Sequence, residues 1–249
     1  MTRFAGRVCV VNGAASEIGR AVAARFAAEG GVVVGVDVIG HDVGEQSVQA
    51  DLTDEAQVRA LYDDVVATHG HLDVVYNNVG LMDRGDLSLL DTDLDTWRRV
   101  QDANLTSVFL SCKHAVPHLR GTEPSGGAIV NAASFLADIG AATAQMGYAA
   151  AKAGVVQLTR DLGVHLARSG VRVNAVLFGP IDTAAQRAVF ERNPGALDKR
   201  LVHWPMGRFG TLDEAAATVA FLASDDAGFI TASAIPLDGG ITEAFTVPD

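Results

Sequence analysis

The chain has 249 residues, of which 49% are apolar and 20% are charged. This length and apolar content suffice for an α/β domain with a large buried core, and they argue against disorder. The net charge of −11 lacks the basic excess typical of nucleic-acid-binding proteins, so we expect no nucleic-acid partner.

The N-terminal residues lead directly into a strand-like segment and lack the apolar run of a signal peptide. We find no uncharged stretch long enough to cross a bilayer, so we expect no membrane partner.

Cys9 and Cys112 do not have the spacing of metal ligands. We therefore expect no metal site and a reducing, cytoplasmic location.

Short valine-rich segments alternate with longer helical patterns along the chain. Strands are expected at Val8–Val11, Val32–Val36, Leu72–Tyr76, Ala128–Val130, Val171–Leu177 and Ala234–Leu237. Helices are expected near 17–29, 54–69, 93–119, 148–168 and 213–222. Because these strands show little polar alternation, we expect both of their faces to be covered. The pattern predicts an α/β fold, a Rossmann-like doubly wound parallel sheet of about seven strands with helices on both faces.

One long segment, at about 182–208, has no regular pattern and contains Pro194 and Pro205. Loops of this length in compact domains are commonly lids or binding loops, so we expect it to contact a substrate. No internal repeat or linker composition interrupts the chain, and residues 1–249 are expected to form one domain.

A glycine-rich turn, from Gly13 to Gly19, follows the first expected strand and leads into a helix. Such a turn directs free backbone N–H groups and the positive end of the helix dipole at a phosphate. Asp37 ends the second strand about 20 residues later, where a carboxylate can bond a ribose 2′-OH. The turn has no Arg or Lys that could compensate a 2′-phosphate, so we expect NAD in preference to NADP.

Tyr148 and Lys152 are four residues apart and share one face of an expected helix. An ammonium group near a phenol lowers its pKa from about 10, which permits acid/base chemistry near neutral pH. Such pairs are common on helix surfaces, and the dinucleotide turn upstream is what favours a catalytic role. Ser134 follows the Ile129–Val130 strand, and Asn104 lies where two helical segments join.

Over essentially its whole length, the sequence resembles the short-chain dehydrogenase/reductase family. The matching motifs are Gly13…Gly19, Asp51-Leu52, Asn77-Asn78-Val79-Gly80, Asn104, Ser134, Tyr148…Lys152, Gly179-Pro180-Ile181-Asp182-Thr183, Phe229-Ile230-Thr231 and Leu237-Asp238-Gly239-Gly240. In this order and spacing they are highly specific.

The resemblance implies that Tyr148 exchanges the hydroxyl proton, that Ser134 holds the substrate oxygen, and that Lys152 binds the nicotinamide ribose. Asn104 would hold a water in a proton relay to Lys152. The residues expected to contact the cofactor are Gly13, Ser16, Glu17, Ile18, Gly19, Asp37, Asp51, Leu52, Asn78, Gly80, Tyr148, Lys152, Pro180, Ile181 and Thr183. The resemblance also implies a homotetramer that acts on a small molecule.

Glu17 departs from the family pattern because it stands where a glycine is usual. We expect its side chain to point to solvent. Its carboxylate suits the helix dipole but lies near the pyrophosphate, so its effect on cofactor affinity is open.

The residues expected to wall the substrate pocket are apolar, although some should simply pack the loop: Leu81, Met82, Phe135, Leu136, Met146, Phe190, Trp204 and Met206. They favour an NAD-dependent dehydrogenase of a small, fairly apolar secondary alcohol. A 3-oxoacyl thioester reductase is the alternative, but the places where it would meet an acidic carrier, Ser125–Gly127 and Arg168–Ser169, offer few basic residues. A catalytically silent dinucleotide sensor is a remote third interpretation, because both Tyr148 and Lys152 are present.

Overall fold

Seven parallel strands form one sheet in the order β3-β2-β1-β4-β5-β6-β7 in the computed structural model, which describes residues 2–119, 126–140, 144–192 and 195–245. The strands are β1 Val8–Asn12, β2 Val32–Asp37, β3 Gln46–Gln49, β4 Val74–Asn77, β5 Ala128–Ser134, β6 Arg172–Phe178 and β7 Ala234–Leu237. The strand order runs outward from β1 in one direction and from β4 in the other. This doubly wound arrangement confirms the predicted fold class.

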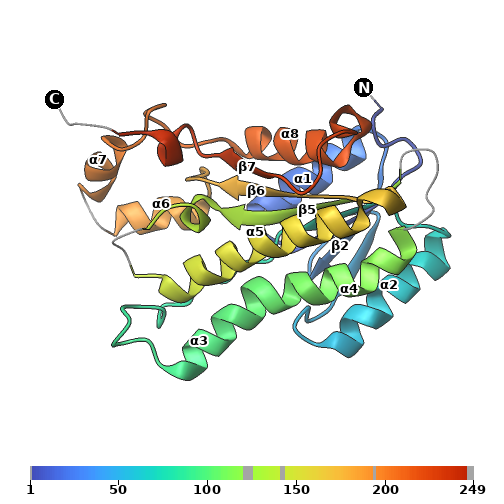
Figure 1. Cartoon of the computed structure of the whole chain (residues 1–249), viewed down its shortest axis with the longest axis horizontal. Helices are drawn as coiled ribbons and strands as arrows, with labels where there is room; N and C mark the ends of the chain where they lie inside the picture. The colour runs from blue at the N-terminus through green and yellow to red at the C-terminus, as the bar shows by residue number, and fades with distance from the viewer. Residues whose placement is uncertain (1, 120–125, 141–143, 193–194, 246–249) are drawn as a thin grey trace.

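Helices cover both faces of the sheet (Figure 1). On one face lie α1 (Glu17–Ala28) and α8 (Leu212–Ala223), and on the other lie α2 (Glu55–His69), α4 (Ser107–Leu119) and α5 (Met146–Leu166). The shorter helices are α3 (Leu94–Gln101), α6 (Ala184–Glu191) and α7 (Ala196–Leu201). Short 3-10 turns occupy Phe135–Ala137, Ala167–Ser169, Asp225–Ala227 and Ile241–Glu243. No helix in the described ranges is long and apolar enough to span a bilayer.

Alternate residues of each central strand enter different hydrophobic cores. Val8 and Val10 of β1 pack with α2, α4 and α5, whereas Cys9 and Val11 pack with α1 and α8. Because side chains alternate across a sheet, a strand buried on both faces needs apolar residues at every position. The valine-rich strands are therefore buried on both faces of the sheet, which confirms the expectation from their lack of polar alternation.

The structure differs from the sequence-based expectations at β3, in the segment 182–208 and within the helix expected over 93–119. The four-residue edge strand β3 was missed because its residues are polar and only half-buried. The segment 182–208 is not irregular throughout, since it contains α6 and α7, and the side chain of Thr183 caps α6 by accepting a hydrogen bond from the Gln186 N–H. Within that segment, Asn193 and Pro194 lie outside the described residues.

The helix expected over 93–119 is interrupted by a π-helical turn at Asp102–Thr106. There the side-chain amide of Asn104 donates a hydrogen bond to the Val100 carbonyl at 2.9 Å. In a regular helix that carbonyl would accept the backbone N–H of Asn104. A side chain that enters the helical ladder in this way is a known cause of π-bulges, which often mark functional sites.

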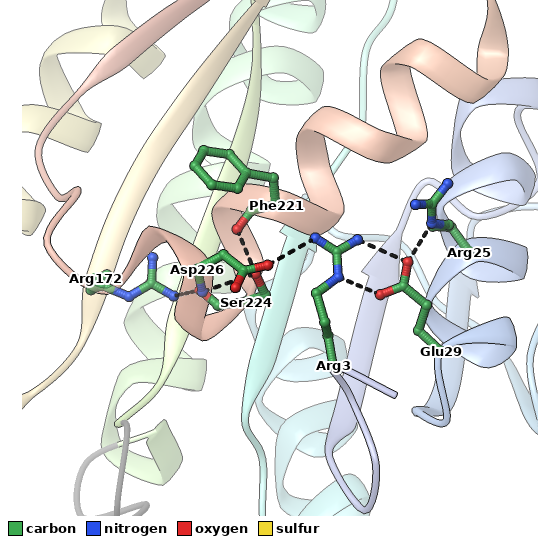
Figure 2. Close-up of polar contacts among 7 residues, drawn as sticks. All are labelled: Arg3, Arg25, Glu29, Arg172, Phe221, Ser224 and Asp226. Carbon is green, nitrogen blue, oxygen red and sulfur yellow. Dashed lines mark hydrogen bonds and ion pairs between the residues drawn. The ribbon is translucent and has the colours of Figure 1, made fainter. Parts of the chain in front are cut away.

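An ion-pair network joins the N-terminal segment to the ends of two helices (Figure 2). The Arg3 guanidinium donates to both carboxylate oxygens of Glu29, which follows α1, and more weakly to Asp226, which follows α8. Arg25 donates to the same Glu29 carboxylate. On the other side of the view, Arg172 donates to the carbonyl of Ser224 and so caps the C-terminus of α8. These contacts hold α1 and α8 together on one face of the sheet.

The Glu29→Gln variant should lower the free energy of unfolding by about 2 kcal/mol at pH 7, because Arg3 and Arg25 lose a largely buried partner. Hydrogen bonding from Arg3 lowers the pKa of Glu29 from 4.5 to about 2. A depressed pKa stabilises the fold above the unfolded value, and this contribution is lost as the pH falls from about 4.5 to about 2. Urea denaturation should therefore show a lower free energy of unfolding for the variant than for the wild type at pH 7. The two free energies should converge as the pH approaches about 2. The exposed Asp226→Asn variant is the control and should change stability by less than about 0.5 kcal/mol.

Candidate functional site

Two adjoining cavities lie at the carboxyl ends of the central strands and share Asn78, Val79 and Gly80. The first has a volume of about 310 Å³ and extends along the ends of β1 and β2. The second has a volume of about 260 Å³ and lies beyond β5 and β6. Open parallel sheets bind ligands where the strand order reverses, and here that point lies between β1 and β4.

The glycine turn brings three backbone segments too close together for side chains. Gly13 has a φ of +77°, and a Cβ there would lie 3.0 Å from the Asn78 backbone. A Cβ on Gly19 would lie 2.2 Å from the carbonyl oxygen of Gly13. Ser16 caps α1 by accepting a hydrogen bond from the Gly19 N–H at 3.1 Å.

The backbone N–H groups of Glu17 and Ile18 have no acceptor among the described residues. Two free donors at the start of a helix, beside a turn with no room for side chains, are suited to a phosphate. The turn therefore fits the diphosphate of a dinucleotide.

Asp37 and Asp51 are the only charged residues among the described residues that line the first cavity. The Asp37 carboxylate accepts hydrogen bonds from the N–H groups of Ala15 and Ile39, at 3.0 and 3.3 Å. The Asp51 carboxylate accepts from the N–H and hydroxyl of Thr53. Leu52 also lines this cavity, which places these three expected residues together with Gly13, Ser16, Asn78 and Gly80.

Glu17 does not point freely into solvent, which corrects the expectation from the sequence. Its carboxylate accepts a hydrogen bond from the Ala184 N–H at the start of α6, at 2.6 Å, and lies 4.0 Å from the Arg187 guanidinium. The helix dipole of α6 favours a carboxylate at this place. Glu17 and Gly19 line neither cavity, so Gly19 shapes the turn and Glu17 contributes its backbone N–H rather than its side chain.

Ser134, Tyr148 and Lys152 line the second cavity together. Ser134 ends β5, and the other two lie one turn apart on α5. The Lys152 ammonium donates hydrogen bonds to the carbonyls of Val79 and Ala132, at 3.1 and 3.0 Å. It lies 5.6 Å from the centre of the Tyr148 ring. Three of the four side chains predicted to be catalytic are therefore brought to one cavity, and the fourth, Asn104, does not line it.

Burial changes the acid–base properties of this group. It lowers the pKa of Lys152 from 10.5 to about 8, because the ammonium is removed from water. Burial also raises the pKa of Tyr148, with a hydrogen bond from Ser134 acting in the opposite direction. The direction expected for Tyr148 from a neighbouring ammonium alone was downward. Burial instead favours the neutral form of both groups, so it raises the pKa of Tyr148 and lowers that of Lys152.

Asn104 lies at the π-helical turn, fully buried beside Gly80. Its amide donates to the carbonyls of Leu81 and Val100, and its oxygen accepts the Leu81 N–H at 3.1 Å. These bonds fix the loop that follows β4 between the two cavities. The expected junction of two helical segments at this residue is confirmed.

Some of the other residues expected to contact cofactor or substrate line the two cavities, and others pack within the segment 182–208 or border separate hollows. Ile18, Pro180, Ile181 and Thr183 line the second cavity, as do Met82, Phe135 and Leu136. Leu81 lines the first. Phe190 and Trp204 instead pack against each other and Phe209, while Met146 and Met206 border separate hollows. Only part of the apolar set therefore faces the reactive group. Ser125 lies outside the described residues.

Two residues of the site gave no signal in the sequence. Asp86 accepts hydrogen bonds from the N–H groups of Gly147 and Tyr148 at the start of α5, both at 2.8 Å. Arg200 of α7 lines the second cavity. Each reaches the site from a distant segment without local periodicity, so only the tertiary structure reveals it.

Comparisons with known proteins agree with this arrangement. A family model described as Enoyl-(Acyl carrier protein) reductase matches residues 13–242. The chain is 40% identical over 250 residues to cis-4-hydroxycyclohexanecarboxylate dehydrogenase of Sinomonas cyclohexanicum, with 96% of this chain and 98% of that protein covered. It is 34% identical over 251 residues to a 3-oxoacyl-(acyl-carrier-protein) reductase of Thermotoga maritima, with coverage of 96% and 99%.

Among solved structures, levodione reductase superposes with a TM-score of 0.88 at 34% identity, covering 97% of this chain and 100% of that one. These matches span nearly the whole chain and agree with the doubly wound sheet and the glycine turn. The protein therefore belongs to the short-chain dehydrogenase/reductase family, and it is an oxidoreductase that acts on CH–OH groups with a nicotinamide cofactor.

Proposed function

We propose that the protein is an NAD-dependent dehydrogenase that interconverts a small, fairly apolar secondary alcohol and its ketone. The observation that carries this proposal is one continuous site. The cavity that holds Ser134, Tyr148 and Lys152 adjoins the cavity that holds the glycine turn and Asp37. The relative that acts on a hydroxycyclohexanecarboxylate supports an alicyclic alcohol as the substrate class.

In this proposal, the Ser134 hydroxyl holds the substrate oxygen and the Tyr148 phenolate takes its proton. Bound NAD supplies the acceptor for the hydride that leaves the carbinol carbon with two electrons. Lys152, fixed by the carbonyls of Val79 and Ala132, binds the nicotinamide ribose, and its ammonium favours the Tyr148 phenolate. In the reverse direction Tyr148 returns the proton to the developing alkoxide, which the Ser134 hydroxyl stabilises.

A screen of secondary alcohols with NAD and NADP, followed by the absorbance of the reduced cofactor, tests the reaction. It should include linear, alicyclic, steroid and sugar alcohols, 4-hydroxycyclohexanecarboxylate and a 3-hydroxyacyl thioester. We expect turnover of an alicyclic or short linear alcohol, and Tyr148→Phe should lower kcat by at least about 100-fold because the acid/base is lost. Undiminished turnover in Tyr148→Phe would contradict the mechanism.

The cofactor preference rests on the charge of the first cavity. Two carboxylates and no cation line it among the described residues, so a 2′-phosphate would meet repulsion there. The wild type should therefore favour NAD over NADP by at least about tenfold in kcat/KM, and Asp37→Asn should remove most of that difference. Asp42→Asn is the control, because Asp42 pairs with Arg20 outside the cavity. Equal use of NADP by the wild type would refute the preference.

A 3-oxoacyl thioester reductase is the second candidate, supported by the Thermotoga maritima relative. It would use NADPH or NADH and would turn over an acetoacetyl thioester. The acidic first cavity argues against NADPH. A catalytically silent sensor would bind the cofactor and turn over none of these substrates.

Asp86 is a positioning residue for the proposed acid/base. Gln145, which precedes α5, has a φ of +140° and no side-chain hydrogen bond that caps the helix. The buried Asp86 carboxylate, only 3% exposed, replaces the missing cap by accepting from Gly147 and Tyr148. A Cβ on Gly147 would lie 3.2 Å from that carboxylate, so the contact is close. Asp86 thereby fixes the backbone of Tyr148 itself.

Asp86→Asn should lower kcat by about tenfold or more and leave the KM for NAD nearly unchanged, because small displacements of a reacting group are costly in rate. The asparagine amide can satisfy only one of the two N–H groups. Asp93→Asn is the matched control: Asp93 caps α3 by accepting from the Thr96 N–H at 2.7 Å, and it lines neither of the two cavities. A loss of stability with an unchanged kcat would show that Asp86 is only a structural cap.

We also propose that the chain is a single domain that assembles as a homotetramer in the cytoplasm. Exposed apolar side chains on the outer helices, Phe109 of α4 and Val164 of α5, support burial against other subunits.

A further inference from the structure

The second cavity is lined by a positively charged side chain, that of Arg200, which has no role in the proposed reaction. Arg200 lines it together with Tyr148 and Lys152, and no Asp or Glu is among the described residues that line it. The chain as a whole has 30 acidic and 19 basic residues, so an acid-free cavity with two cations is unusual for this protein. The cavity therefore has the charge expected for an anionic ligand.

Among the described residues, Arg200 has no carboxylate partner, unlike Arg187 and Arg208, which lie on either side of it in the chain. Arg187 pairs with Asp182 at 2.7 Å, and Arg208 pairs with Glu214 at 2.7 Å. In the described part of the chain, no carboxylate lies within ion-pair distance of Arg200. The Lys152 ammonium already donates to two carbonyls, which leaves the Arg200 guanidinium as the available cation of the cavity.

An aromatic cluster holds the Arg200 head group in place. The guanidinium lies 5.3 Å from the centre of the Phe190 ring. Phe190 packs edge-on against Trp204 and Phe209, and Phe190 and Trp204 are 9% and 8% exposed. Stacking on an aromatic face leaves the N–H donors of the guanidinium free to form paired hydrogen bonds with a carboxylate.

We infer that the substrate is a hydroxy acid whose carboxylate binds Arg200 while its hydroxyl lies at Ser134 and Tyr148. This inference rests on the proposed function and specifies its substrate class. Met82, Phe135 and Leu136 line the same cavity and would contact the apolar body between the two polar ends. The carboxylate is unchanged by the reaction, in which the carbinol carbon loses a hydride to NAD and the hydroxyl loses a proton to Tyr148.

Equilibrium binding of two unreactive probes tests the anion site separately from turnover. Cyclohexanecarboxylate and cyclohexanecarboxamide have the same ring and differ in charge. With NADH bound, the wild type should bind the acid about tenfold more tightly than the amide, as measured by calorimetry. Arg200→Met should abolish that difference and leave the affinities for the amide and for NADH unchanged.

Two further variants isolate the role of the guanidinium. Arg200→Lys should restore part of the preference for the acid, because it keeps the charge but loses the planar donor pair. Lys199→Met removes one positive charge from the same helix without touching the cavity, and it should behave as the wild type.

Equal binding of acid and amide by the wild type would overturn the inference. Weaker NADH binding in Arg200→Met would also overturn it, because Arg200 would then serve the cofactor diphosphate. Acid-selective binding that depends on Arg200, without turnover of any alcohol, would support the anion site and contradict the proposed dehydrogenase activity. The two proposals can therefore fail independently.

Discussion

Hydrogen bonds among Asn12, Asn77 and Asn131 join the three central strands directly below the candidate site. The Asn12 amide donates to Asn77, and the Asn77 amide donates to Asn131, both at 2.8 Å. These residues are register partners across β1, β4 and β5. Asn131 also donates to the Thr159 hydroxyl of α5 at 2.9 Å, two turns beyond Lys152. All four side chains are buried, so the loss of any one would leave an unsatisfied polar group. This chain of hydrogen bonds therefore fixes β1, which leads into the glycine turn, relative to α5, which carries Tyr148.

Charge is divided between the two halves of the site. Two carboxylates, Asp37 and Asp51, line the first cavity, whereas two cations, Lys152 and Arg200, line the cavity of Tyr148. The two cations differ in environment: Lys152 is 2% exposed and its pKa is lowered to about 8, while Arg200 is exposed beside Phe190. This division supports a neutral ribose hydroxyl in one half and an anionic substrate in the other.

Several helices around the site begin or end on side chains from distant segments. Asp86 caps α5, Glu17 caps α6, and Arg172 caps the C-terminus of α8. Each contact crosses from one chain segment to another, so the position of each helix depends on a neighbouring segment as well as on its own terminal residues. The Glu17 contact has a particular consequence, because it links the glycine turn directly to the segment that carries Arg200.

The sequence by itself determined the fold class and most of the site. Uniformly apolar strands alternating with helices require a parallel sheet covered on both faces, and the turn at Gly13, the acid at Asp37 and the Tyr148–Lys152 spacing are local patterns. Only the tertiary structure decided what depends on distant contacts or burial. Asp86 lies about 60 residues before the helix that it caps, which removes any local signal. The pKa of Tyr148 is raised rather than lowered, because burial cannot be deduced from a four-residue spacing. The place of Arg200 at the second cavity follows from its packing against Phe190.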